Sequence, residues 1–215
     1  MDHNVNIRLV CFDLGGVLIR ICDEWKEAYQ KSGVPRPRRS KRSQVKHQAI
    51  RIALDYELGS INTAECTQEL GRLLDLSVEQ VQAVADAWLR GPYDGVFELI
   101  DELSTKNVQT ACLSNTNENH WRQMSSSDDS NHLPLDRLSY RFASHLIGHR
   151  KPDEPIYRHV EKTTDISPES ILFFDDDQTN ARSACGIGWH AQQIRLNGDP
   201  VSQIRKHLCA YGVIS

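Results

Sequence analysis

The chain has 215 residues, of which 39% are hydrophobic and 25% are charged, and its formal net charge at pH 7 is -4. This composition is typical of a soluble globular protein that forms one sizeable core, with or without a small appended module. No apolar stretch is long enough to cross a bilayer, and the negative charge argues against a nucleic-acid binder.

The amino terminus and the cysteines both favour a cytoplasmic protein. The start, MDHNVNIRLV, lacks the basic region and the apolar core of a signal peptide, so we do not expect secretion. The cysteines at positions 11, 22, 66, 112, 185 and 209 include no closely spaced pair of the kind that holds zinc. Cys11 and Cys112 lie in apolar, strand-like runs, which indicates small buried hydrophobes of a reducing compartment and not a disulfide framework.

The first predicted element is a buried strand at Leu9–Phe12, an apolar run that is too short for a helix and is followed by glycines. Asp13 stands where this strand ends, and Gly15 and Gly16 allow the tight turn that brings amide groups close to an anion. Open α/β sheets bind their ligands at the carboxyl ends of such strands. Taken alone, the same residues also fit an aspartate that caps the next helix before an ordinary turn.

The chain from about Asp23 to Gly91 is predicted to be an all-helical insertion. Its expected helices are the one that begins within Val17–Gln30, then Val45–Leu58, Thr63–Leu74, and a helix that starts after Ser77 and ends at Gly91 and Pro92. Ser77 and Gln80 form a capping-box pattern. The loop Ser32–Ser43 opens a basic cluster, Arg36 to Lys46, which could bind an anionic substrate or nucleic acid, although a solvated helix start is the simpler interpretation.

From Tyr93 onward, helices and strands alternate. The expected strands are Val108–Leu113, Phe142–Ile147, Ile171–Phe174 and Ala191–Leu196. The expected helices are Gly95–Leu103, Asn119–Met124, Asp153–Thr163 and Thr179–Ile187, with a polar exposed loop at Ser125–Pro134. Repeated strand-helix units predict an α/β fold in which a parallel sheet carries helices on both faces.

Three of these later strands lead into polar residues of distinct chemical kinds. Ser114 and Asn115 follow one strand, Lys151 follows the next, and Asp175 and Asp176 follow the third. Each group by itself is unremarkable, since a Ser-Asn-Thr sequence is a common turn or helix cap and a Lys-Pro pair is usually a surface feature. A carboxylate, a hydroxyl, a lysine and an acidic pair in that order form a far more specific set.

In this order the residues resemble the four motifs of the haloacid dehalogenase-like hydrolase superfamily. The resemblance covers nearly the whole chain and is closest to the phosphatase-rich branch that has a helical cap after the first motif. It implies a Rossmann-like α/β core formed by residues 1–22 and 92–215, and a small helical cap formed by residues 23–91.

The resemblance also implies a magnesium-dependent phosphohydrolase that acts on a small phosphorylated metabolite. Asp13 would attack phosphorus and form an aspartyl-phosphate. Because the attack brings an anion against an anion, we expect Mg²⁺ between Asp13, the carbonyl of Gly15, and the acidic pair. Within the pair, similarity to the family favours Asp176 as the direct ligand and Asp175 as a direct or water-mediated one.

The remaining matched residues would bind and neutralise the phosphoryl group. Ser114 and Asn115 would hold it together with the backbone at Leu14 and Gly15, and Lys151 would offset the negative charge of the nucleophile and the phosphate. Asn180 lies where the family often has a polar group that supports the acidic loop. We assign no role to His120 and His149, which flank the second and third motifs.

Gly15 departs from the family pattern. Most phosphatases of this type have a second aspartate at this position as general acid and base, a group worth about 100- to 10,000-fold in rate. Two alternatives therefore stay open. One is a binding or regulatory protein with weak or no catalysis. The other is a haloacid dehalogenase, in which the same aspartate attacks carbon without a metal, but that branch lacks the acidic pair. The sequence predicts neither the substrate's identity nor the oligomeric state.

Overall fold

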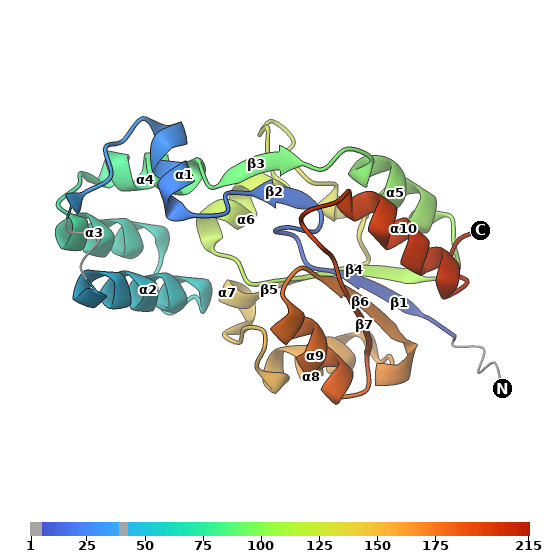
Figure 1. The fold of residues 1–215 in the computed structure, drawn as a ribbon. Helices are drawn as coiled ribbons and strands as arrows, with labels where there is room; N and C mark the ends of the chain where they lie inside the picture. Colours follow the sequence, from blue (N-terminus) through green and yellow to red (C-terminus); the bar gives the residue numbers. More distant parts are fainter. Residues whose placement is uncertain (1–5, 39–42) are drawn as a thin grey trace.

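The structure is a computed structural model that describes residues 6–38 and 43–215, and it is built around a five-stranded parallel sheet (Figure 1). The strand order is β5-β4-β1-β6-β7, with every neighbouring pair parallel. The strands are β1 Leu9–Phe12, β4 Gln109–Ser114, β5 Tyr140–Ala143, β6 Ile171–Asp175 and β7 His190–Gln193. The expected α/β class is confirmed, and β1 occupies the centre of the sheet.

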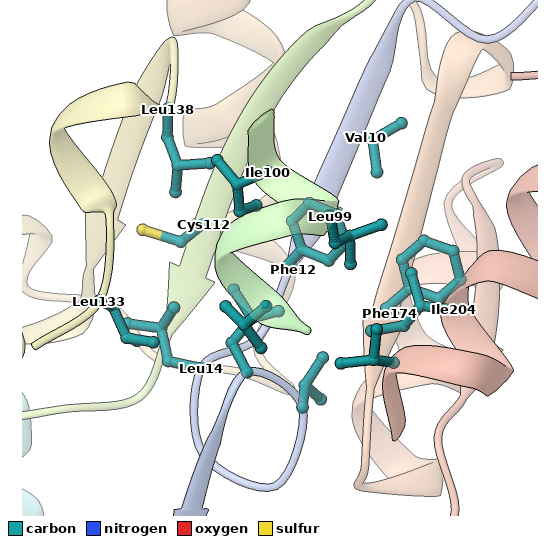
Figure 2. Packing of buried hydrophobic residues seen from close by; sticks show 14 of the residues in the cluster. Val10, Phe12, Leu14, Leu99, Ile100, Cys112, Leu133, Leu138, Phe174 and Ile204 are labelled. Carbon is teal, nitrogen blue, oxygen red and sulfur yellow. The ribbon is translucent and has the colours of Figure 1, made fainter. Parts of the chain in front are cut away.

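Helices cover both faces of this sheet. Helices α5 (Val96–Ser104) and α10 (Pro200–Ala210) lie on one face, and α8 (Glu154–Thr164) and α9 (Gln178–Gly186) lie on the other (Figure 1). Because side chains alternate along a strand, Val10 and Phe12 of β1 pack into the first cluster, whereas Leu9 and Cys11 pack into the second. Figure 2 shows the first cluster, where Phe12 and Phe174 lie among side chains of α5 and α10. Burial on both faces explains why the strands are continuous apolar runs.

A second, two-stranded sheet corrects part of the sequence prediction. Strand β2 (Ile19–Ile21) pairs in antiparallel with β3 (Leu89–Pro92), and helix α1 begins only at Trp25 and runs to Ser32. The helix expected to begin within Val17–Gln30 does begin there, but the strand that precedes it was not predicted. Gly91 and Pro92, predicted to end a helix, belong to β3. Local periodicity misses this pairing because the partner strand lies far along the chain.

Between β2 and β3 the chain forms the predicted helices, which we call the helical segment (Figure 1). After α1 come α2 (Ser43–Glu57), α3 (Thr63–Leu74) and α4 (Val78–Asp86). The predicted capping box of Ser77 is confirmed, and α3 has a second one in which Asn62 and Glu65 exchange hydrogen bonds. Within the basic cluster, Arg39, Lys41 and Arg42 lie outside the described residues, while Arg38 and Lys46 are exposed.

Two other elements differ from expectation. The apolar run Phe142–Ile147 is not one strand, because β5 ends at Ala143 and a short helix α7 (Ser144–Ile147) follows, in which Leu146 is 68% exposed. Helix α10 was not predicted, although its start has Asp199 as N-cap and Pro200 in the first turn. Helix α6 spans Glu118–Ser125, and two 3-10 helices occupy Leu135–Arg137 and Pro168–Ser170. The predicted final strand is shorter and earlier, at His190–Gln193.

The cysteines are free, and Cys11 and Cys112 are fully buried as expected for small hydrophobes. In the part of the chain that the structure describes, none of the helices has both the length and the apolar character that crossing a membrane requires.

Candidate active site

The carboxyl ends of three neighbouring strands deliver the predicted polar residues to one edge of the sheet. Asp13 follows β1, Ser114 is the last residue of β4, and Asp175 is the last residue of β6. Phe12 pairs with Phe174, and the N–H of Asp13 donates to the Phe174 carbonyl at 2.8 Å. The parallel register therefore places Asp13 beside Asp175.

Lys151 lies between these carboxylates. Its Nζ is 2.9 Å from Asp13 Oδ2 and 2.6 Å from Asp175 Oδ2. Lys151 is 1% exposed and Asp175 is fully buried. Buried charges are tolerated only when they are paired and hydrogen-bonded, so each of these groups depends on the others. The contact with Asp13 is the one that the sequence predicted for Lys151, whereas its contact with Asp175 was not anticipated.

Three carboxylates cluster at this edge of the sheet, and two of them contact Lys151. Asp13, Asp175 and Asp176 each offer an oxygen, and these oxygens lie within 4.8 Å of one another. The Asp175 carboxylate also accepts hydrogen bonds from Asn180 Nδ2, at 3.1 and 3.2 Å, and from the N–H of Asp177, at 2.8 Å. One ammonium beside a cluster of three carboxylates leaves an excess of negative charge when all three are ionised, and clustered carboxylate oxygens are the donor set that hard divalent cations prefer. The residues thus fit such a cation.

The pKa values of these groups are shifted by burial and by the neighbouring charges. Burial raises the pKa of Asp13 to about 7, against the opposing effect of Lys151, and burial followed by the charge of Asp175 raises the pKa of Asp176 to about 6. Burial alone would lower the pKa of Lys151, but the adjacent charges of Asp13 and Asp175 outweigh it and raise that pKa. The cluster is therefore short of positive charge, which is what a bound divalent cation would provide.

The two glycines after Asp13 lie in different environments. Gly16 has a φ of 71°, and a Cβ added there would lie 2.6 Å from Asp176 Oδ2. A Cβ at Gly15 would make only ordinary contacts, 3.5 Å from two side-chain carbons of Ile21. Gly16 is thus required for the close approach of the acidic loop, whereas Gly15 leaves room for a side chain.

The two residues of the second motif, Ser114 and Asn115, have different environments. Ser114 is buried at the strand end. The side chain of Asn115 exchanges hydrogen bonds with the backbone of Lys151, an interaction that the sequence did not reveal. The N–H of Leu14 donates to Asp13 Oδ1 at 2.7 Å and helps to orient that carboxylate.

The side chains of the flanking residues do not belong to the carboxylate cluster, although the backbone N–H of Asp177 donates to Asp175. His120 Nε2 is 2.9 Å from the Ala85 carbonyl and joins α6 to α4, while His149 is exposed. Asp177 caps α9 by accepting from the N–H of Thr179, and Asp23 is exposed.

Contacts between the helical segment and the sheet edge escaped the sequence analysis. Glu57 of α2 pairs with Arg150 at 3.1 Å, next to Lys151 in the chain. At the start of α6, the N–H of Asn119 donates to the Tyr56 hydroxyl at 3.0 Å. No sequence signal could have found these pairs, because the partners lie on elements far apart in the chain.

Comparison with known proteins matches this geometry to a family. The family model for haloacid dehalogenase-like hydrolases matches residues 7–188. The chain is 28% identical over 205 residues to a D-ribitol-5-phosphate phosphatase of Bacteroides thetaiotaomicron, covering 90% of this chain and 94% of that protein. It is 29% identical over 136 residues to a sesquiterpene phosphatase of Aspergillus oryzae, covering 62% of this chain and 67% of that protein.

Solved structures show the same fold. A haloacid dehalogenase-family enzyme of Bacteroides thetaiotaomicron superimposes with a TM-score of 0.80 at 24% identity, covering 93% of this chain and 99% of the other. That enzyme's complex with magnesium and inorganic phosphate superimposes with a TM-score of 0.74 at 22% identity, covering 90% and 97%. Because the family model spans most of its length, the chain belongs to the haloacid dehalogenase-like hydrolase family.

Proposed function

We propose that the protein is a magnesium-dependent phosphatase that hydrolyses a small phosphorylated metabolite through an aspartyl-phosphate on Asp13. The observation that carries this proposal is the cluster of Asp13, Asp175 and Asp176 at the edge of the sheet, with Lys151 in contact with Asp13 and Asp175. The phosphatase names of two relatives, and the magnesium and phosphate complex of a structural neighbour, support it.

Asp13, Asp176 and the carbonyl of Gly15 would bind Mg²⁺, with Asp175 as a direct or water-mediated ligand. The hydrogen bonds that Asp175 already accepts from Lys151, Asn180 and Asp177 favour the water-mediated arrangement. When bound, the ion supplies positive charge that reduces the repulsion between the nucleophile and the phosphate.

In the first step, a carboxylate oxygen of Asp13 forms a bond to phosphorus while the bond from phosphorus to the leaving oxygen breaks. Water then attacks the phosphorus of the aspartyl-phosphate, which releases inorganic phosphate and restores the carboxylate. Ser114 and the backbone at Leu14, Gly15 and Asn115 hold the phosphoryl oxygens. Lys151 balances the negative charge on Asp13 and on the phosphoryl group.

The helical segment serves as a cap that excludes water and selects the substrate. Its proximity supports this role, because Glu57 and Tyr56 at the end of α2 contact Arg150 and the start of α6. The N–H of Thr63, at the start of α3, also donates to the carboxylate of Glu118 in α6 at 3.1 Å. In this proposal the core is formed by residues 1–22 and 92–215, and the cap is formed by residues 23–91.

We also propose a cytoplasmic location, which the buried free cysteines favour.

Gly15 supports one alternative, a weakly catalytic regulatory protein that binds a phosphorylated ligand. The acidic pair, which the dehalogenase branch lacks, disfavours a dehalogenase.

A panel of phosphorylated metabolites, assayed with Mg²⁺ and with excess EDTA, tests the proposal. We expect metal-dependent release of inorganic phosphate from at least one compound, and its loss in Asp13→Asn, which is nearly isosteric and should fold normally. Phosphate binding without turnover of any compound would favour the regulatory alternative. Metal-independent halide release from 2-haloacids would favour the dehalogenase.

Titration with Mg²⁺ tests the ligand assignment separately. Asp176→Ala should weaken Mg²⁺ binding measured by calorimetry, because a direct carboxylate ligand is lost. Asp177→Ala is the matched control, since Asp177 is exposed and caps α9. Equal affinities in Asp176→Ala and the unmodified protein would show that Asp176 is not a ligand.

A further inference from the structure

Both polar atoms of the Asn115 side chain bind the backbone of one other residue. Asn115 Oδ1 accepts from the N–H of Lys151 at 2.8 Å, and Asn115 Nδ2 donates to the carbonyl of Lys151 at 2.9 Å. The two bonds close a ring between residues that are 36 positions apart in the chain. A primary amide can match a peptide group in this way because it presents one donor and one acceptor side by side.

This ring anchors a residue that no regular element holds. Lys151 lies in the turn between α7 and α8, outside any helix or strand. Its long side chain must nevertheless keep Nζ within 2.9 Å of Asp13 and 2.6 Å of Asp175. A lysine has four rotatable side-chain bonds, so fixing its backbone reduces the conformations that compete with this geometry.

We propose that Asn115 is a positioning residue that acts on catalysis through Lys151 and does not bind the phosphoryl group with its side chain. The inference rests on the proposed phosphatase function and refines it, because it assigns the Asn115 side chain to Lys151 and the Asn115 backbone N–H to the substrate. It also links two motifs, since the residue after Ser114 sets the location of the lysine. Misplacing a catalytic group by about 1 Å can lower a rate about 100-fold.

A double-mutant cycle separates positioning from direct contact. Asn115→Ala should lower kcat by about 10- to 100-fold in the unmodified protein. In a Lys151→Met background, which removes the ammonium but keeps an unbranched side chain, Asn115→Ala should have almost no further effect, because its route of action is gone. Equal losses in both backgrounds would show that the Asn115 side chain contacts the substrate itself.

Asn117→Ala is the matched control. Asn117 lies two residues later and caps α6 by accepting from the N–H of His120 at 3.0 Å. Its loss should lower stability by an amount similar to that of a helix cap, without changing how the protein responds to Lys151→Met. If Asn115→Ala behaves like Asn117→Ala, with lower stability but an unchanged kcat, the role of Asn115 is only structural and the proposal is wrong.

Two measurements do not require turnover. Hydrogen exchange of the Lys151 backbone amide should become faster in Asn115→Ala but not in Asn117→Ala. Calorimetry with inorganic phosphate and Mg²⁺ should show about tenfold weaker binding in Asn115→Ala, and no difference between Lys151→Met and the double variant. Unchanged exchange at Lys151 would overturn the positioning role. Absence of phosphatase activity in every variant, with the exchange effect present, would instead count against the proposed function.

Discussion

The edge of the parallel sheet and the helical segment differ in how deeply their side chains are buried and in what those side chains contact. At the sheet edge, Asp13, Lys151 and Asp175 are all at most 9% exposed, and each charge contacts another. In the helical segment, Tyr56 is the buried residue of the 15-residue helix α2, and Ile50 is 57% exposed. The small apolar cluster of this segment consists of Cys22, Ala28, Tyr29 and Val84 with three half-buried neighbours.

This difference separates two tasks. The groups at the sheet edge are fixed by strand register and by each other, so a change to one group disturbs all of them. The helical segment is held largely by local devices such as its capping boxes, and surface changes there usually cost little. If the helical segment selects the substrate as proposed, its surface can therefore vary while the chemistry at the sheet edge stays constant.

The largest expected effect breaks the sheet-edge network. Lys151→Ala leaves two buried carboxylates without their cation, which should lower the free energy of unfolding by about 3–5 kcal/mol and severely impair turnover. Denaturant unfolding and steady-state kinetics measure the two effects. Arg90→Ala is the control, because Arg90 of β3 pairs with Glu27 of the helical segment at 3.1 Å while both side chains are partly exposed. Arg90→Ala should lower the free energy of unfolding by at most about 1 kcal/mol. Similar losses of stability in Arg90→Ala and Lys151→Ala would contradict the comparison.

The next prediction concerns the missing acid. Because a Cβ at Gly15 makes only ordinary contacts with Ile21, Gly15→Asp should be accommodated. Without a general acid the wild type should favour leaving groups that are stable as anions, such as aryl, acyl and anomeric phosphates. Gly15→Asp should then accelerate alkyl phosphate hydrolysis by about 10-fold or more relative to aryl phosphate hydrolysis.

A Brønsted series of leaving groups on both proteins, at saturating Mg²⁺, measures this effect. If chemistry is rate-limiting and the wild type has the shallower dependence on leaving-group acidity, the argument fails. A residue of the helical segment, such as Asp23, would then have to supply the proton.

A smaller effect should distinguish the adjacent glycines. Gly16→Ala places a methyl group 2.6 Å from Asp176 Oδ2 at a positive φ, so we expect a loss of about 1–3 kcal/mol in stability together with weaker Mg²⁺ binding. Gly15→Ala should change both quantities little. Thermal unfolding with and without Mg²⁺ provides the measurement. Equal tolerance at the two positions would mean that the acidic loop does not need the close approach at Gly16.

The smallest effect is expected in the helical segment. Ser77→Ala removes the side-chain acceptor for the N–H of Gln80 and should lower stability by about 1 kcal/mol. Turnover of a small aryl phosphate should be unchanged, because α4 contributes none of the proposed catalytic groups. A large drop in kcat at temperatures where the variant stays folded would show that the two regions are more tightly coupled than their construction indicates.

The sequence by itself determined the fold class and which residue types reach the site. Apolar runs bounded by glycine or polar residues identified β1, β4 and β6, because strands buried on both faces must be apolar throughout. The order of Asp13, Ser114, Lys151 and the acidic pair predicted one site through its resemblance to the four motifs of the family. The sequence also predicted the capping box at Ser77, because its two partners lie within one helical turn.

Only the tertiary structure decided the features that depend on distant partners. Strand β2 was not predicted, because Ile19–Ile21 becomes a strand only by pairing with Leu89–Pro92. Whether Asn115 faces a substrate or the backbone of Lys151 depends on where a turn 36 residues later is placed. The room at Gly15 and its absence at Gly16 likewise follow from how Ile21 and Asp176 approach the turn. Local sequence encodes propensity and pattern, whereas such contacts exist only once the chain has packed.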